Sequence, residues 1–105
     1  MAKSDFLITE TKDDETVNFR ISGRVNSKNA NELEFKLERT LREEEGKNIV
    51  LNMSKVEYLS STGIRVILKI FRLSKDSGIK FNIEFPSENV RNVLGITALD
   101  ELLLK

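Results

Sequence analysis

Apolar and polar residues alternate along the first part of the chain in a way that is typical of strands. Residues 6–10 are rich in apolar side chains and are followed by the polar run 12–15. Apolar and polar residues then alternate over 17–22, which places the apolar side chains on one face of an extended segment. Two such segments joined by a short polar run predict a β-hairpin, and Gly23 is expected to end its second strand.

Two longer segments show the spacing of amphipathic helices. Over 27–45 the main apolar residues lie three or four positions apart, and Gly46 follows, as is typical of a helix end. The second segment, 64–77, has a broad apolar stripe and is followed by Gly78. We expect both helices to bury one face, and the second to leave only a narrow basic ridge exposed. The basic ridge consists of Arg65, Lys69 and Arg72.

Two further strands are predicted between and after these helices. Residues 49–51 are apolar without alternation, which favours a strand covered on both faces. This segment is therefore the best candidate for the centre of the sheet. Alternation returns over 79–85 and stops at Pro86, which indicates a strand with one exposed face.

The remaining C-terminal residues are expected to be helical. Ser87 can cap a short helix, which Gly95 is expected to end. Thr97 and Asp100 resemble the capping box of a last helix.

The predicted order is therefore two strands, a helix, a strand, a helix, a strand and two helices. Two strand-helix-strand units imply right-handed crossovers and parallel strands. We predict one α/β domain over residues 1–105, with a mostly parallel sheet of four to five strands, an N-terminal hairpin and about four helices packed on it. A chain of this length can bury a single hydrophobic core.

Composition excludes several classes of function. The 17 basic residues balance the 17 acidic ones, so the chain lacks the positive charge typical of direct nucleic-acid binding. It contains no cysteine and no histidine, which removes thiol and imidazole catalysis and the usual zinc ligands. No segment is long and apolar enough to span a membrane. We expect a soluble cytoplasmic protein.

Candidate functional residues gather in two loops, 23–26 and 52–61. Sites in open α/β sheets form beyond the carboxyl ends of the strands, and both loops follow a predicted strand and precede a helix. We therefore expect these loops to lie at the same edge of the sheet.

The second loop enters its helix through the sequence LSSTGIRVIL, residues 59–68. If Ser60 accepts a hydrogen bond from the first turn, Ser61 becomes the first helical residue and its hydroxyl faces outward. Gly63 is expected to leave the backbone bare for a close approach.

We expect the fold to tolerate a phosphate on Ser61, and we expect this phosphate to affect the binding of a partner. The phosphate adds roughly −1.5 to −2 charges beside the free N–H groups of a helix start, which accommodate an anion. A partner docked over this helix start has to bury or repel that charge. Two plainer interpretations stay open: the hydroxyls only cap a helix, and the basic ridge is only a solvated face rather than a surface that meets acidic groups.

Three stretches of the chain resemble the STAS domain, in particular the single-domain bacterial anti-sigma-factor antagonists. The resemblance runs from about Phe6 to Leu104. The stretches are VNFRISGRVNSKNANELEFKLERTL, NIVLNMSKVEYLSSTGIRVILKI and NVRNVLGITALDELL.

The resemblance implies a partner-switching function. The unphosphorylated protein binds an anti-sigma factor with serine-kinase activity, so that the sigma factor is released. The kinase phosphorylates one serine at the start of the second helix, which corresponds to Ser61, and a PP2C-type phosphatase reverses the reaction. The resemblance implies a binding module that is not an enzyme and needs no metal or cofactor. We expect a monomer or weak homodimer with no direct contact to nucleic acid or membrane. The expected partner-binding residues are Arg24, Asn26, Ser60, Thr62, Gly63, Ile64 and Arg65.

The chain also departs from this family. Ser60 stands where many phosphorylated members have an aspartate, and Asn26 and Asn52 stand where acids are common. Two other functions therefore stay open. One is a STAS module in another assembly, such as a stressosome-like, chemosensory or lipid-transport complex, and the other is a small ligand-binding protein that uses the loop hydroxyls.

Overall fold

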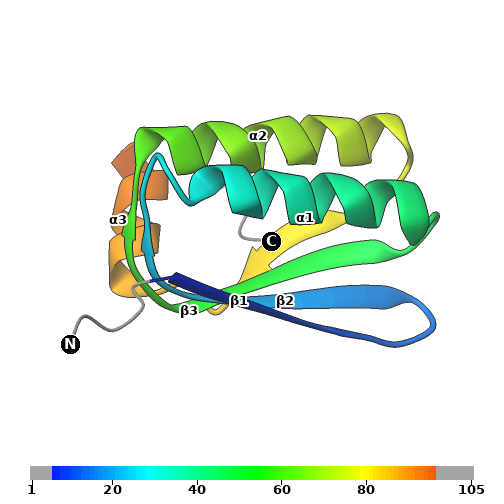
Figure 1. Cartoon of the computed structure of the whole chain (residues 1–105), viewed down its shortest axis with the longest axis horizontal. Coiled ribbons are helices and arrows are strands. Elements are labelled where there is room, and N and C mark those ends of the chain that lie inside the picture. Colours follow the sequence, from blue (N-terminus) through cyan, green and yellow to red (C-terminus); the bar gives the residue numbers. More distant parts are fainter. Residues whose placement is uncertain (1–5, 97–105) are drawn as a thin grey trace.

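The computed structural model describes residues 6–96, which form an α/β fold (Figure 1). The last predicted helix, at Thr97 and beyond, lies outside the described residues. The strands of the described part are β1 (Phe6–Lys12), β2 (Thr16–Val25), β3 (Asn48–Leu59) and β4 (Phe81–Glu84), and its helices are α1 (Ala30–Glu43), α2 (Ser61–Asp76) and α3 (Glu88–Ile96).

The described strands form one sheet in the order β1-β2-β3-β4. The strands β1 and β2 are the predicted antiparallel hairpin, whereas β2 pairs with β3 and β3 with β4 in parallel. The carboxyl ends of β2 and β3 and the starts of α1 and α2 therefore lie at one end of the molecule, on the left in Figure 1. The predicted mostly parallel sheet with an N-terminal hairpin is confirmed.

The two long helices lie side by side over the same face of the sheet (Figure 1). Beneath them, Ile49, Leu51 and Met53 of β3 are fully buried, whereas Val50 and Asn52 between them are only partly buried. The prediction that this strand is covered on both faces is therefore wrong. A run of three apolar residues is too short to reveal that its middle member, Val50, faces away from the helices.

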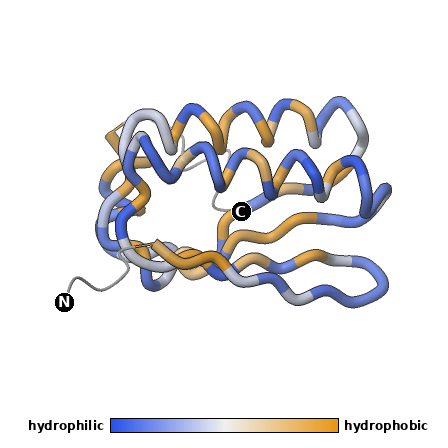
Figure 2. The backbone as a smooth tube through the Cα atoms, viewed as in Figure 1, coloured by the Kyte–Doolittle hydropathy of each residue, from blue (hydrophilic) through white to orange (hydrophobic). Residues whose placement is uncertain are grey.

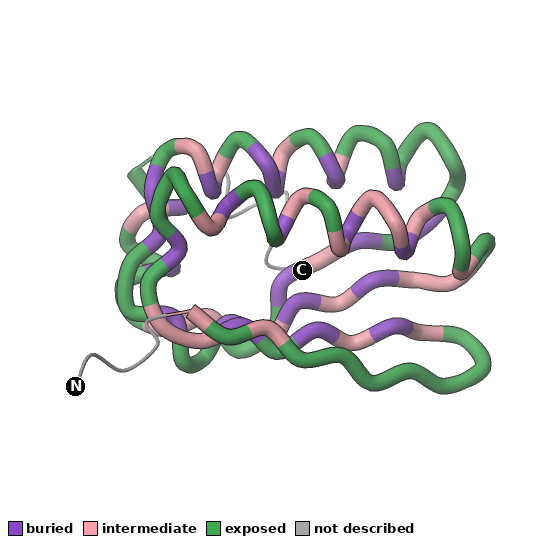
Figure 3. Tube along the Cα trace, viewed as in Figure 1, coloured by how far each residue is buried: buried purple, intermediate pink, exposed green. Residues whose placement is uncertain are grey.

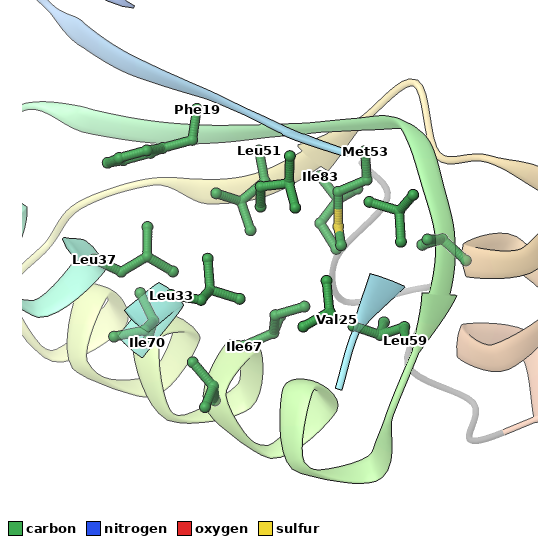
Figure 4. Packing of buried hydrophobic residues seen from close by; sticks show 14 of the residues in the cluster. Phe19, Val25, Leu33, Leu37, Leu51, Met53, Leu59, Ile67, Ile70 and Ile83 are labelled. Atoms are coloured by element: carbon green, nitrogen blue, oxygen red, sulfur yellow. The ribbon is translucent and has the colours of Figure 1, made fainter. Parts of the chain in front are cut away.

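Buried positions lie on the strands and on the two long helices that pack over them (Figure 3), and their side chains form one hydrophobic core cluster. Figure 2 shows the same division as apolar positions on the inner sides of both layers. Full burial of an aliphatic or aromatic side chain contributes about 1.5 to 3 kcal/mol, so this cluster holds α2 firmly against the sheet. Core residues labelled in Figure 4 are Phe19, Val25, Leu33, Leu37, Leu51, Met53, Leu59, Ile67, Ile70 and Ile83.

The strands β2 and β3 extend further than the sequence predicts. β2 passes through Gly23 and ends at Val25, and β3 ends at Leu59, so most of the two predicted loops belongs to paired strands. The pairing shifts register between Arg20 and Arg24, where Gly23 has a φ of 88°. Such irregularities break the alternation of buried residues, which is why the pattern ends early in the sequence.

The helix α3 also extends further than predicted. Its start is capped as expected, because the Val90 N–H donates to the Ser87 hydroxyl oxygen at 3.2 Å. It then continues through Gly95 to Ile96, so the prediction that Gly95 ends this helix is wrong. A glycine costs a helix only about 1 kcal/mol relative to alanine. The burial of Val90 and Leu94 outweighs that cost.

Ser74 offers a test of the packing under α2. Its side chain is fully buried, and its hydroxyl has no hydrogen-bond partner among residues 6–96. An unsatisfied buried hydroxyl costs about 1 to 3 kcal/mol. We expect Ser74→Ala to raise the free energy of unfolding by about 1 kcal/mol, measured by denaturant titration. Ser77→Ala, at an exposed position on the same helix end, should change it by less than about 0.5 kcal/mol. A less stable Ser74→Ala protein would contradict this assignment.

Candidate functional site

The end of β2 and the start of α2 are joined directly. The Ser60 N–H donates to the Val25 carbonyl oxygen at 2.9 Å, so the ladder between β2 and β3 continues into the residue that precedes α2. This bond places the segment after β2 beside the first turn of α2. The two candidate regions of the sequence are therefore brought together, as expected.

Ser60 and Ser61 have different surroundings. The Ser60 backbone is extended, its side chain is 6% exposed, and its hydroxyl oxygen accepts a hydrogen bond from the Gly63 N–H at 3.1 Å. Ser61 is the first residue of α2 and is exposed. The prediction that Ser60 caps the helix and that the Ser61 side chain is exposed at its start is confirmed.

Gly63 is buried, and the close approach that it allows is made within the chain. A Cβ atom at this position would lie 2.8 Å from Leu59 Cδ1 and 3.0 Å from Val25 Cγ1. The glycine therefore lets the first turn of α2 pack tightly on the ends of β2 and β3. Its bare backbone is not turned toward solvent, contrary to the expectation from the sequence, because the buried residue faces the core.

A network of side-chain hydrogen bonds shapes the turn between β2 and α1. The Asn26 Oδ1 accepts from the N–H groups of Lys28 and Asn29, and the Asn29 Oδ1 accepts from the Asn26 N–H. The Asn29 Nδ2 also donates to the Arg24 carbonyl oxygen at 2.9 Å. Asn29 was not predicted as a site residue, although two asparagines three residues apart are typical of such a turn. Residues 26–29 therefore form a turn before α1, and the prediction that the helix already includes residues 27–29 is wrong.

A contact between side chains ties this turn to α2. The hydroxyl oxygens of Ser27 and Thr62 lie 3.2 Å apart, within hydrogen-bond distance. Thr62 is half-buried by this arrangement, while Asn26 and Ser27 are exposed. Ser27 was not predicted as a site residue, and only the folded structure brings it within reach of Thr62.

Arg24 and Tyr58 form an exposed pair at the ends of β2 and β3. They are register partners in the ladder, and the Arg24 guanidinium carbon lies 4.7 Å from the centroid of the Tyr58 ring. The ring is 42% exposed. Stacking on an aromatic face holds the cation in place while leaving it accessible. Tyr58 is thus part of the candidate site, although its sequence position gave no signal for this.

The basic ridge on α2 is partly neutralised by α1. Lys69 Nζ lies 2.6 Å from a Glu34 carboxylate oxygen and 2.7 Å from a Glu38 oxygen. Hydrogen bonds to Glu34 and then to Glu38 raise the pKa of Lys69, which stays cationic. The acidic surface that Lys69 meets is therefore in its own chain, whereas Arg65 and Arg72 are exposed.

A groove between α1 and α2 adjoins the first turn of α2. Its volume is about 370 Å³, and both acidic and basic side chains contribute to it. This mixture favours a polar protein surface over an apolar ligand. The lining residues are Asn31, Glu34, Thr62, Arg65, Val66 and Lys69.

The arrangement suits docking and modification of a hydroxyl group. Within residues 6–96, no group of three or more acidic side chains could hold a metal ion. No helix in the same range is long and apolar enough to cross a membrane. What the site offers is an exposed hydroxyl at a helix start, together with the exposed cations Arg24 near the end of β2 and Arg65 one turn further along α2.

Comparisons with known proteins agree with this architecture. The family model described as STAS domain matches residues 8–105. The anti-sigma factor antagonist SpoIIAA in its unphosphorylated form has a TM-score of 0.79 and 19% identity, over 93% of this chain and 84% of that chain. Bacillus SpoIIAA in the phosphorylated form has a TM-score of 0.74 and 18% identity, over 93% and 87%. An anti-sigma factor antagonist from Mycobacterium paratuberculosis has a TM-score of 0.82 and 20% identity, over 98% and 87%. These likenesses show a shared fold.

Gly63→Ala tests whether this glycine is required for internal packing. The added methyl group would overpack the contact with Leu59 and Val25, which costs about 1 to 3 kcal/mol against a gain of up to about 1 kcal/mol in helix propensity. We expect a net loss of stability in thermal unfolding. Gly95→Ala in α3 is the matched control, because within residues 6–96 no atom outside its own helix backbone and chain neighbours lies within 4 Å of its Cβ position, and it should stabilise the protein. Equal stabilisation by both substitutions would contradict the packing role.

Proposed function

Because the chain belongs to the STAS domain family, we propose that it is an anti-sigma-factor antagonist controlled by phosphorylation of Ser61. In its unphosphorylated form it binds an anti-sigma factor that is also a serine kinase, and the sigma factor is released. The kinase transfers the γ-phosphoryl group of ATP to the Ser61 hydroxyl oxygen, with loss of the hydroxyl proton and release of ADP. A PP2C-type phosphatase restores the hydroxyl group. The proposal places this single STAS domain in the cytoplasm.

The observation that carries the proposal is the position of Ser61. Its hydroxyl is exposed at the first residue of α2, while the neighbouring Ser60 hydroxyl is buried and occupied by the cap. Thr62 is half-buried and lies within hydrogen-bond distance of Ser27. Among these three adjacent hydroxyl groups, a kinase therefore reaches Ser61 most readily.

The proposed docking surface surrounds this hydroxyl. Arg24, Asn26 and Arg65 are exposed and provide its polar contacts, and the half-buried residues Ile64 and Thr62 of α2 belong to it as well. Ser60 and Gly63 are buried and stabilise the helix start that carries this surface. Ser60 caps α2, and Gly63 packs against the ends of β2 and β3. Arginine and an exposed aromatic ring such as Tyr58 are frequent at the centres of protein interfaces.

Phosphorylation acts on this surface through charge. A phosphate on Ser61 is tolerated in the free protein, because it lies at the positive end of the α2 dipole and near unpaired N–H groups. In a complex the same charge has to be buried or brought against partner groups that fit a neutral hydroxyl. A cost of about 2 to 4 kcal/mol corresponds to roughly 30- to 1000-fold weaker binding. The switch therefore needs no change of fold.

Ser61→Ala tests the site of modification. The substitution should abolish phosphate incorporation by the cognate kinase, measured by mass spectrometry, while partner binding stays close to that of the unmodified protein. The controls Ser27→Ala and Thr62→Ala should still be phosphorylated. Phosphate found on Ser60 or Thr62 of the unmodified sequence would refute the assignment to Ser61.

Ser61→Glu tests whether charge at this position controls docking. We expect at least about tenfold weaker binding to the anti-sigma factor in calorimetric titration, with little change in thermal stability because an acid at a helix start is favourable. Ser77→Glu, an exposed serine at the other end of α2, should leave binding unchanged. Equal affinity of Ser61→Glu and the unmodified protein would show that this surface is not the interface.

A further inference from the structure

The face of the sheet opposite α1 and α2 carries polar side chains that no described helix covers (Figure 1). The strand register places Thr9 beside Arg20, Arg20 beside Asn52, and Asn52 beside Glu84, in a row across β1, β2, β3 and β4. These residues alternate along their strands with residues that face the core, so they lie on the open face. We call them the polar row. A second row beside it consists of Thr11, Asn18, Val50 and Asn82.

The polar row has a cation on one side and an anion on the other. Arg20 and Glu84 are both exposed, and neither has an ion-pair partner among residues 6–96. One strand, β3, separates them, so their backbones are two strand spacings or about 10 Å apart. Arg20 and Glu84 lie at similar distances on either side of Asn52. If a second copy is rotated by 180° about an axis that runs along β3, its Glu84 faces Arg20 of the first copy and its Arg20 faces Glu84. The row is therefore complementary to itself.

An exposed aromatic ring adjoins this row. Phe85 directly follows Glu84, and its side chain is 66% exposed. Its φ is 53°, a backbone conformation that is rare for a bulky residue and often marks a functional surface. Together with residues of both rows, Phe85 lines a hollow of about 370 Å³ on the open face. The exposed apolar residue Phe85 therefore lines the same hollow as the unpaired residues Arg20 and Glu84.

We propose that the open face of the sheet binds a second copy of this chain, in a dimer whose two sheets pack face to face. A two-fold axis along β3 brings Arg20 of each copy opposite Glu84 of the other, which gives two intermolecular ion pairs around Asn52. The same rotation carries Phe85 of each copy toward β1 of the other. There Leu7, which is 58% exposed, lies on the open face as the register partner of Ser22. Every contact occurs twice, as a two-fold interface requires.

The available area indicates a weak dimer. Four strands about 4.8 Å apart and roughly five residues long span about 20 Å by 17 Å. This is less than the roughly 800 Å² per partner of a standard stable interface. The dissociation constant is therefore expected between the micromolar and the millimolar range. Exposed ion pairs are screened by salt, so high ionic strength should weaken the dimer.

The dimer is independent of the function proposed above. Its contacts lie on the open face, whereas Ser61 lies at the end of the helical layer on the other side of the sheet (Figure 1). Rotation about an axis along the strands keeps the strand direction. The two Ser61 residues of a dimer consequently point to the same side, and the dimer presents two copies of the docking surface together.

A charge exchange tests the two ion pairs. Sedimentation velocity of the full chain, from micromolar to millimolar concentration, should show dimers of the unmodified protein. Arg20→Glu and Glu84→Arg should each reduce association at least about tenfold, because each variant brings like charges together. An equimolar mixture of the two variants should associate again, since the new carboxylate of one variant then faces the new guanidinium of the other. Arg42→Glu and Glu32→Arg, at exposed positions of α1, are the matched controls and should dimerise like the unmodified protein.

The same experiment can overturn the proposal. A chain that stays monomeric at millimolar concentration would refute it. So would single variants that associate as well as the unmodified protein, or a mixture that fails to associate while circular dichroism shows both variants folded. Leu7→Ser should weaken the dimer as well, and an unchanged dissociation constant for that variant would contradict the predicted pairing with Phe85.

Discussion

The parallel pairing of β2 with β3 reaches from Thr16 and Asn48 to Val25 and Leu59, and the hydrogen bond from Ser60 to Val25 extends it to the start of α2. This continuous pairing determines where the candidate site lies. It brings the segment after β2 against the first turn of α2, and it stacks Arg24 on Tyr58. A shorter ladder would leave the same residues on two separate loops.

Within residues 6–96, the two long helices cover one face of the sheet and leave the other open, which gives this part of the protein two different surfaces. On the helical side, the ends of β2 and β3 meet the starts of α1 and α2, where exposed N–H groups and the hydroxyl of Ser61 favour interaction with charged groups. On the other side, Arg20 and Glu84 lie on either side of Asn52 in the row across β2, β3 and β4. The core lies between the two proposed binding surfaces and separates them.

Several residues of the candidate site also stabilise the fold. Ser60 caps α2, Gly63 permits its close packing, and Lys69 joins α2 to Glu34 on α1. The family resemblance implied that Ser60 and Gly63 belong to a partner surface, but buried contacts of this kind depend on residues distant in the chain. Within residues 6–96, no side-chain hydrogen bond or ion pair gives Ser61 such an internal role. Among the three adjacent hydroxyl groups of residues 60–62, that of Ser61 is therefore the one whose modification disturbs the fold least.

The order of the elements within residues 6–96, the parallel sheet, the cap at Ser60 and the exposure of Ser61 could all be predicted from the sequence, because they depend on the spacing of nearby residues. Only the tertiary structure decided that β3 is open on one face, that Gly63 faces Leu59, and that Lys69 is paired. It also brought Arg20, Asn52 and Glu84 into one row across three strands. These features depend on contacts between segments far apart in the chain, which local periodicity does not encode.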